Sequence, residues 1–145
     1  DKEYDRVTNI NIKAVFFLSQ VVSSYFIKNE IHGHILFISS SRGNEPAWSP
    51  YGISKWGLNG LTKGLAMKLL PYGIIVNAIA PGVVATELLG YNEGETIYSE
   101  ENSLNRMAVP EEIAVYAKYL VSDLGNMVVG ETINISGGRG IFTIK

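Results

Sequence analysis

The sequence predicts an α/β protein built on a doubly wound parallel sheet. Segments with helical periodicity alternate with short apolar runs of the kind that form buried parallel strands. Along the 145 residues the order is helix, strand, helix, strand, helix, strand. This alternation predicts parallel strands joined by right-handed crossovers, with helices packed against the sheet.

The first helix is predicted over residues 5–30, and a strand follows it. One stripe at helical spacing holds Val15, Leu18, Val22 and Tyr25. Phenylalanines and a valine cover much of the remaining surface, so this helix is expected to pack on two neighbours at once. Gly33 interrupts the pattern, and residues 35–38 (Ile-Leu-Phe-Ile) form a continuous apolar run that is typical of a buried parallel strand.

A polar loop then leads into a second long helix, predicted over residues 51–70. Its apolar face holds Leu58, Leu61 and Leu65. Its interior holds Gly57, Gly60 and Gly64. Each glycine costs a helix about 1 kcal/mol relative to alanine, so we favour close approach of another helix over glycines that are merely tolerated.

The last part of the chain holds two more strands, a lid and a helix. Residues 74–80 predict a buried strand that ends at Pro81-Gly82. Residues 86–105 are acidic and have few apolar anchors, so we expect a mobile lid there. Pro110, followed by two glutamates, is a typical helix start. Residues 132–136 alternate in polarity, as a half-exposed edge strand does.

Composition narrows the classes of protein to be considered. The chain is 46% hydrophobic and 18% charged, with a net charge of −2 and no cysteine. It has no basic block, which leaves binding to nucleic acid or an anionic membrane without support. No apolar run approaches the roughly 18 residues of a membrane span. The sequence therefore predicts a cytoplasmic protein without a metal site, and the high apolar content suggests a face that binds a partner.

A tyrosine and a lysine stand out as candidates for chemistry. Tyr51 and Lys55 are four residues apart at a helix start, so their side chains share a face. The strand before them runs directly into Ser39, Ser40 and Ser41, and sites in parallel α/β folds form at the carboxyl ends of strands. A nearby ammonium favours the phenolate form of a tyrosine, so such a pair can exchange a proton with an alcohol.

Several short motifs occur in a fixed order along the chain. They lie at residues 11–16 (Asn-Ile-Lys-Ala-Val-Phe), 38–43 (Ile-Ser-Ser-Ser-Arg-Gly), 51–55 (Tyr-Gly-Ile-Ser-Lys), 76–86 (Val-Asn-Ala-Ile-Ala-Pro-Gly-Val-Val-Ala-Thr), 110–114 (Pro-Glu-Glu-Ile-Ala) and 130–138. With these motifs the chain resembles the short-chain dehydrogenase/reductase family, of the single-domain type that includes 3-oxoacyl-reductase-like enzymes. The resemblance runs from Asp5 to Gly138 and implies a Rossmann fold.

The resemblance implies a reaction and a set of site residues. The reaction is reversible hydride transfer between NAD or NADP and a small carbonyl or secondary-alcohol substrate. Tyr51 would be the general acid/base, Lys55 would assist it and hold the nicotinamide ribose, Ser40 would bind the substrate oxygen, and Asn11 would hold a water in a proton relay. The cofactor-binding residues would be Tyr51, Lys55, Pro81, Gly82, Val84 and Thr86. The family also implies a homotetramer or a homodimer.

Two departures from the family pattern matter. The 145 residues contain neither the Gly-x-x-x-Gly-x-Gly turn that binds the cofactor phosphates nor the Asn-Ala-Gly of the fourth strand. We therefore expect residues 1–145 to be a partial single domain that holds the catalytic and substrate half but not the N-terminal dinucleotide-binding part. Ile31 and Tyr72 stand where relatives that act on acyl carrier protein tend to have basic residues, which makes docking of that carrier less expected.

Three functional hypotheses remain open at this point. The first is an NAD(P)-dependent oxidoreductase of unspecified substrate. The second is a 3-oxoacyl-(acyl-carrier-protein) reductase specifically. The third is a non-catalytic assembly fragment that binds no dinucleotide. The choice between NAD and NADP stays open as well, because the residues that recognise the ribose 2′ position belong to the expected missing part.

Overall fold

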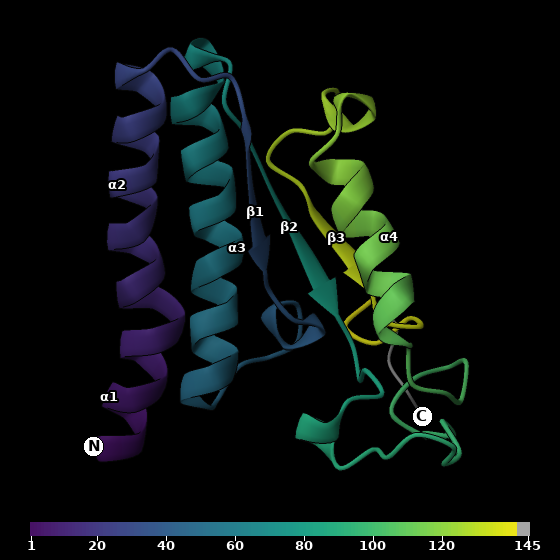
Figure 1. Ribbon diagram of the computed structural model, residues 1–145. Coiled ribbons are helices and arrows are strands. Elements are labelled where there is room, and N and C mark those ends of the chain that lie inside the picture. Colours follow the sequence, from purple (N-terminus) through teal and green to yellow (C-terminus); the bar gives the residue numbers. More distant parts are fainter. Residues whose placement is uncertain (142–145) are drawn as a thin grey trace.

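The computed structural model describes residues 1–141, and these form one three-stranded sheet with helices on both faces (Figure 1). The α-helices are α1 (Lys2–Thr8), α2 (Val15–Lys28), α3 (Pro50–Leu69) and α4 (Pro110–Leu120), and a π-helical segment, η1 (Asn9–Ala14), joins α1 to α2. The strands are β1 (His34–Ile38), β2 (Ile75–Pro81) and β3 (Thr132–Ile135). Short 3₁₀ turns occupy Ser41–Gly43, Leu70–Tyr72, Glu87–Leu89 and Asp123–Gly125.

The sheet is entirely parallel, with strand order β1-β2-β3. His34 pairs with Ile75 across the first ladder, and Ala78 pairs with Thr132 across the second. All three strands point the same way, so their carboxyl ends meet at one edge (Figure 1). The predicted α/β class, element order and parallel sheet are confirmed, and the ends of the elements differ from the predicted ones by a few residues.

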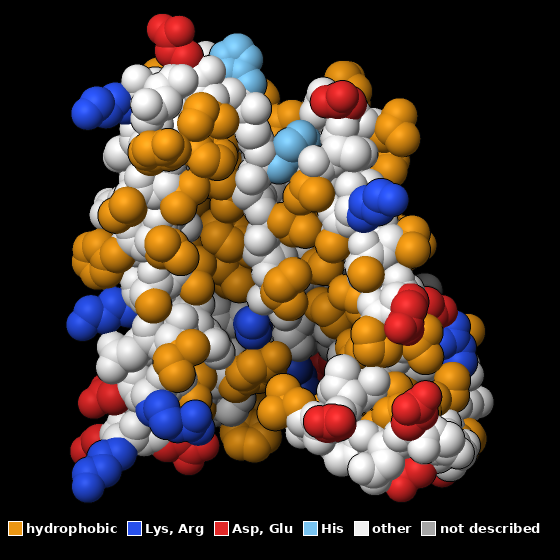
Figure 2. Space-filling view, in the orientation of Figure 1, with side chains coloured by type: hydrophobic (Ala, Val, Ile, Leu, Met, Phe, Trp, Pro, Cys, Tyr) orange, Lys and Arg blue, Asp and Glu red, His pale blue; other side chains and the backbone are white. Residues whose placement is uncertain are grey.

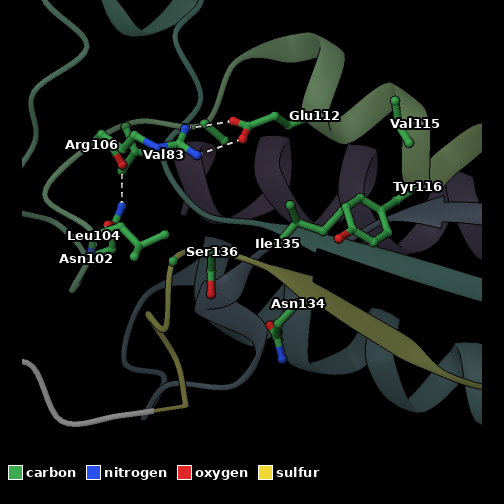
Figure 3. A pocket seen from close by; sticks show the side chains of 12 residues that line it. Val83, Asn102, Leu104, Arg106, Glu112, Val115, Tyr116, Asn134, Ile135 and Ser136 are labelled. Carbon is green, nitrogen blue, oxygen red and sulfur yellow. Dashed lines mark hydrogen bonds and ion pairs between the residues drawn. The ribbon is translucent and has the colours of Figure 1, made fainter.

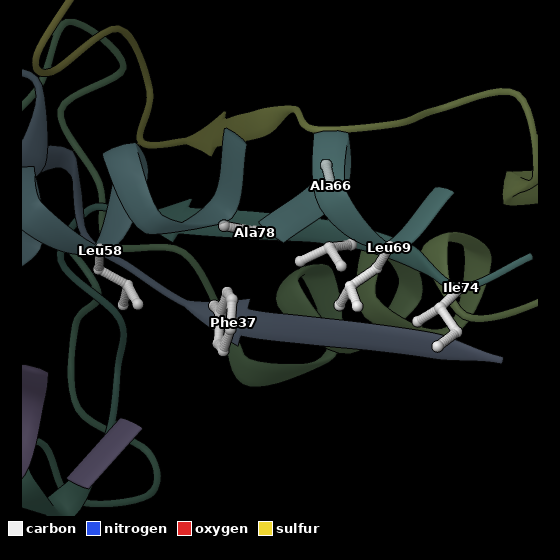
Figure 4. Close-up of a cluster of buried hydrophobic side chains, with 7 residues drawn as sticks. Phe37, Leu58, Ala66, Leu69, Ile74 and Ala78 are labelled. Atoms are coloured by element: carbon white, nitrogen blue, oxygen red, sulfur yellow. The ribbon is translucent and has the colours of Figure 1, made fainter. Parts of the chain in front are cut away.

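The main core lies between α3 and one face of the sheet. Its buried side chains are Phe37, Leu58, Ala66, Leu69, Ile74, Val76 and Ala78 (Figure 4). Ile79 is also fully buried and points to the other face, because side chains alternate along a strand. On that second face α4 contacts β1 and β2, and its Leu120 is buried. β1 and β2 are thus covered on both faces, which explains why their sequences are largely apolar, whereas β3 alternates in polarity.

The expectation of right-handed crossovers throughout was wrong for one of the two connections. The chain moves across the sheet in the same direction at both steps, from β1 to β2 and from β2 to β3. The helix of the first step, α3, and the helix of the second, α4, cover opposite faces (Figure 1). Two such crossovers have opposite hands. The preference for one hand applies to tight βαβ units, whereas residues 82–109 intervene between β2 and α4.

Of Gly57, Gly60 and Gly64 in α3, only Gly57 accounts for close packing inside the described part of the chain. A Cβ atom at Gly57 would lie 2.9 Å from Cδ1 of Ile12 in η1, so glycine lets α3 approach the first helix. Within residues 1–141, a Cβ at Gly60 or Gly64 would meet no atom within 4 Å. The predicted close approach is therefore confirmed within the chain at Gly57, and the other two glycines lie on an open surface.

Large apolar side chains remain exposed along α2. Its outer face presents Phe16, Phe17, Leu18, Val21 and Tyr25, which are 43% to 67% exposed, and Figure 2 shows hydrophobic side chains gathered over the α2 and α3 side of the molecule. By length and composition the continuous helix from Lys2 to Lys28 could cross a membrane, and 11% of its most apolar window is buried. This is weak evidence for a span, since a helix at a protein interface is apolar in the same way.

A bidentate ion pair fixes the start of α4. Arg106 donates to both carboxylate oxygens of Glu112, at 2.7 and 2.8 Å, and the backbone N–H of Val109 donates to the same carboxylate at 2.9 Å (Figure 3). The guanidinium of Arg106 and the N–H of Val109 lower the pKa of Glu112 from 4.5 to about 2. The ionised carboxylate also complements the positive end of the helix dipole.

Glu112→Gln should therefore remove a stabilisation that depends on pH. Because the pKa of Glu112 is lower in the folded chain, its contribution is complete above the ordinary carboxyl pKa and is lost as the pH falls toward about 2. The difference in urea midpoint between the parent and the variant should be largest near neutral pH and should shrink through about pH 4. Glu111→Gln, one residue away in the same turn, is the matched control. An equal pH dependence in both variants would contradict the assignment.

Candidate active site

The site begins where β1 ends. Ile38 is the last residue of β1, and Ser39, Ser40 and the 3₁₀ turn Ser41–Gly43 follow it at the carboxyl edge of the sheet. The loop then returns to α3, whose first turn is capped by Ser49, since Ser49 Oγ accepts a hydrogen bond from the Gly52 N–H at 3.2 Å. Tyr51 lies in this capped turn, so a fixed helix start positions the phenol beside the end of the strand.

Lys55 connects the helix to the strand. Its ammonium nitrogen donates to the carbonyl oxygen of Ile38 at 2.8 Å and lies 5.5 Å from the centroid of the Tyr51 ring. Burial lowers the pKa of Lys55 from its ordinary value of 10.5. The structure thus brings Tyr51 and Lys55 together at the carboxyl end of β1, as the spacing of the two residues predicted.

Ser39 and Ser40 differ in how their hydroxyls are used. Ser39 Oγ donates to Oδ1 of Asn59 at 2.5 Å, which commits its proton to a structural bond. Ser40 Oγ accepts from the N–H of Arg42 at 3.2 Å. Within residues 1–141 this is the one recorded bond of the Ser40 hydroxyl, so its proton remains available to another acceptor. This difference favours Ser40 over Ser39 as the residue that binds a substrate oxygen.

Asn59 is a site residue that the sequence analysis missed. It follows Lys55 by four residues and lies on the same helix face as Tyr51. Besides accepting from Ser39, it donates to the carbonyl oxygen of Gly43 at 3.1 Å. A Cβ at Gly43 would lie 2.9 Å from the carbonyl oxygen of Lys55, so only glycine lets the loop pack this closely on α3. The i, i+4, i+8 spacing of these polar residues was the signal for Asn59.

Asn11 is beside the site, but its side chain has a structural partner. It lies in the π-helical segment η1, and its Nδ2 donates to Ser54 Oγ at 3.1 Å. Ser54 in turn donates to the carbonyl oxygen of Tyr51 at 2.7 Å. Asn11 therefore supports the first turn of α3 through Ser54. Its role in holding a water stays a prediction.

The predicted cofactor-binding residues after β2 form a second wall at the same edge. Pro81 is the last residue of β2, and the Gly82 N–H donates to the Ile135 carbonyl oxygen at 3.0 Å, which fixes this segment against β3. Val84 forms a bridge to Ala108, and Thr86 Oγ1 contacts the Val84 carbonyl oxygen at 3.4 Å. All four residues are half-buried, so part of each remains accessible at the edge.

A pocket of about 490 Å³ lies elsewhere, between α4, the end of β3 and the segment around Asn102 and Arg106 (Figure 3). Ser40, Tyr51 and Lys55 do not line it. The pocket therefore does not mark the chemistry. Among residues 1–141, no group of three or more His, Asp or Glu side chains is placed to hold a metal ion.

Comparisons with known proteins bear on this geometry. The family model for enoyl-(acyl carrier protein) reductases matches residues 1–139. A 3-oxoacyl-(acyl-carrier-protein) reductase from Thermotoga maritima is 38% identical over 143 residues, and a short-chain dehydrogenase/reductase from Armillaria gallica is 33% identical over 150 residues. The matches cover 95% and 94% of this chain, but 57% of each relative. The chain thus spans little more than half the length of these curated relatives.

Solved structures agree with the fold. A 4-hydroxyisoleucine dehydrogenase complexed with NADH superposes with a TM-score of 0.86 at 33% identity, covering 99% of this chain and 62% of that one. A 3-ketoacyl-(acyl-carrier-protein) reductase from Brucella melitensis complexed with NADH gives 0.85 at 26% identity, covering 97% and 59%. Together with the family match over residues 1–139, these similarities show that the chain belongs to the short-chain dehydrogenase/reductase family.

Proposed function

We propose that this chain carries the proton-handling half of an NAD(P)-dependent oxidoreductase that interconverts a carbonyl and a secondary alcohol. One observation carries the proposal: Tyr51 and Lys55 are held together at the carboxyl end of β1 by the bond from Lys55 to the Ile38 carbonyl oxygen. The relatives named above are dehydrogenases and reductases, and two similar structures are complexed with NADH, which supports this class of reaction.

Each residue has one task in the proposed mechanism. In the reduction direction Tyr51 donates its phenolic proton to the developing alkoxide, and the Ser40 hydroxyl donates a hydrogen bond to the same oxygen. Lys55 supports the phenolate that Tyr51 then becomes, because an ammonium stabilises a neighbouring anion. Asn11 is proposed to hold a water through which the proton is replaced. The nicotinamide, when bound, supplies the hydride.

The residues present fit the nicotinamide end of the cofactor. Lys55 offers an ammonium donor, and Pro81, Gly82, Val84 and Thr86 form a half-buried wall at the same edge. A dinucleotide also needs backbone N–H groups at a glycine-rich turn and a helix N-terminus for its phosphates. The 145 residues hold no Gly-x-x-x-Gly-x-Gly turn. The alternative of a non-catalytic assembly fragment therefore remains a second candidate.

A more specific form of the proposal is that the protein is a 3-oxoacyl-(acyl-carrier-protein) reductase. Relatives of that name match 95% of the chain. Against this version, the chain has Ile31 and the exposed Tyr72 where a basic surface would favour an acidic carrier. We therefore propose a small-molecule carbonyl as the substrate. A cytoplasmic location also stays a prediction.

The exposed apolar face of α2 is proposed to be covered by a second copy of the chain. Five large apolar side chains on this helix are 43% to 67% exposed, and the open glycines Gly60 and Gly64 leave room for close approach on α3. A surface of this kind is rare on a monomer. A homodimer or a homotetramer would bury it.

In the complete gene product, Tyr51→Phe should remove most turnover. The change deletes only the hydroxyl, so the fold and the binding of NADH should be retained. General acid/base catalysis is typically worth about 10²- to 10⁴-fold, so kcat should fall by at least that lower factor. Tyr72→Phe, in the 3₁₀ turn that follows α3, is the matched control and should keep its full rate. A Tyr51→Phe variant that keeps more than about a tenth of the rate would contradict the acid/base role.

The 145 residues alone should bind NADH and NADPH only weakly and should turn over no ketone. The residues proposed to contact the nicotinamide end are present, while the sequence holds no glycine-rich turn for the phosphates. Fluorescence titration of the purified chain with each dinucleotide measures this, with Lys55→Ala as the comparison. Micromolar affinity that Lys55→Ala abolishes would show that the dinucleotide is bound without the glycine-rich turn, and would exclude the assembly fragment.

The purified protein should be a dimer or a tetramer at micromolar concentration, as measured by light scattering. Leu18→Glu places a charge in the exposed face of α2 and should shift the mass toward the monomer. Leu88→Glu introduces the same charge at a residue that is 93% exposed and lies outside the helices, so it should leave the mass unchanged. A monomeric parent protein would overturn the proposed interface.

A further inference from the structure

Arg139, in the turn after β3, joins three segments that are far apart in the sequence. Its side chain is only 12% exposed. Its Nε donates to the Glu45 carboxylate at 2.8 Å, and its NH1 forms an ion pair with Glu101. Glu45 belongs to the loop that follows β1, and Glu101 belongs to the acidic segment at residues 86–105. One shielded guanidinium therefore holds both segments against the end of the sheet.

The contact with Glu45 reaches the candidate active site. The second carboxylate oxygen of Glu45 pairs with Arg42 at 2.7 Å, and the Arg42 N–H donates to Ser40 Oγ at 3.2 Å. The Glu45 carbonyl oxygen also accepts from the Trp56 indole N–H at 2.5 Å. Arg139 is thus connected through two residues, Glu45 and Arg42, to the hydroxyl that is proposed to bind the substrate oxygen. The loop that holds these residues is braced on α3.

The contact with Glu101 anchors the base of the acidic segment. Next to it, Asn102 is 4% exposed and its Nδ2 donates to the Arg106 carbonyl oxygen at 2.7 Å (Figure 3). The Ser103 N–H donates to the Gly137 carbonyl oxygen at 3.2 Å. Farther out, Leu88 is 93% exposed. The segment therefore has a packed base and an exposed tip, and its role as a mobile lid stays a prediction.

The charges explain why one arginine is needed at this point. Glu45 and Glu101 come from different segments and share one guanidinium. Without that cation two carboxylates would face each other, and like charges at short range repel. Without Arg139, Glu45 would keep its ion pair with Arg42, but no shared cation would connect it to Glu101. Loss of Arg139 should therefore separate the base of the acidic segment from the loop that carries Ser40.

We propose that Arg139 is a positioning residue that clasps the base of the acidic segment to the Ser40 loop and thereby shapes the substrate side of the site. The part of this inference that concerns catalysis rests on the proposed oxidoreductase function. The structural part, that Arg139 holds the two segments together, does not. The two parts predict separate measurements.

The test compares Arg139→Met with Arg139→Lys, which keeps the charge, and with Arg6→Met, the same substitution at an exposed residue of α1. Amide hydrogen exchange is measured on the protein as its gene encodes it. Arg139→Met should speed exchange at residues 39–46 and 99–106 by about tenfold or more, because a local contact that opens exposes both segments. Arg139→Lys should restore part of the protection, and Arg6→Met should change neither segment.

Steady-state kinetics test the part of the inference that concerns catalysis. The substrate is the small ketone that the unsubstituted protein reduces fastest among a panel. Arg139→Met should raise the KM for the ketone by about 10- to 100-fold, since small misplacements far from the chemistry cost that much. The KM for the dinucleotide should stay within about twofold. A general loss of folded protein would instead lower the apparent kcat and leave both KM values unchanged, so a rise in the ketone KM alone separates the two. Glu101→Gln is a milder change at a half-exposed side chain, so it should raise the ketone KM by a smaller factor. Combined with Arg139→Met, it should raise the ketone KM no further, because both changes break the same contact.

Several outcomes would overturn the inference. Unchanged exchange at both segments in Arg139→Met, or faster exchange confined to residues 136–141, would overturn the clasp. Faster exchange at both segments without a change in ketone KM would overturn its part in catalysis. Absence of turnover in the unsubstituted protein would instead contradict the proposed function, and the exchange data would still decide whether Arg139 is a clasp. If Arg139→Met does not fold, Glu101→Gln supplies the same two readouts.

Discussion

The hydrogen bond from Lys55 to the carbonyl oxygen of Ile38 is the contact on which the candidate site depends. A backbone carbonyl at the end of a strand is fixed by the ladder behind it, and here the Ser39 N–H donates to the Ile79 carbonyl oxygen at 2.7 Å. The lysine therefore ties the register of α3 to the register of the sheet. Because Tyr51 is one helical turn away, this contact, together with the bonds of Asn59 to Ser39 and Gly43, sets where Tyr51 lies relative to Ser40.

The sequence was sufficient to predict the parts of the fold and site that follow local rules. Buried parallel strands are continuous apolar runs, and Tyr51 and Lys55 share a helix face by spacing alone. The side of the sheet that α4 covers could not be predicted in this way, since a connection as long as residues 82–109 can cross to either face. The contacts of Arg139 with Glu45 and Glu101 could not be predicted either, because no local sequence pattern relates residues so far apart.

The molecule has two kinds of surface. At the carboxyl edge of the sheet, polar side chains are organised by specific bonds, such as those of Asn59 with Ser39 and Gly43. Along α2, large apolar side chains are exposed and make no comparable contacts within residues 1–141. The first surface gains its order from hydrogen bonds inside the chain. The second would gain its stability from association, because only burial removes apolar area from water.

The two tasks of a dinucleotide enzyme, proton transfer and cofactor binding, also belong to separate parts of a doubly wound fold. Proton transfer needs groups held within hydrogen-bond reach of one oxygen, and the contacts around Tyr51, Lys55 and Ser40 lie within a single strand–loop–helix unit. Binding a dinucleotide needs a phosphate cradle of glycine-rich backbone and a helix N-terminus, which belongs to a different βα unit in doubly wound folds. The residues proposed to handle the proton can therefore be brought together in a chain whose sequence holds no Gly-x-x-x-Gly-x-Gly turn for the phosphates.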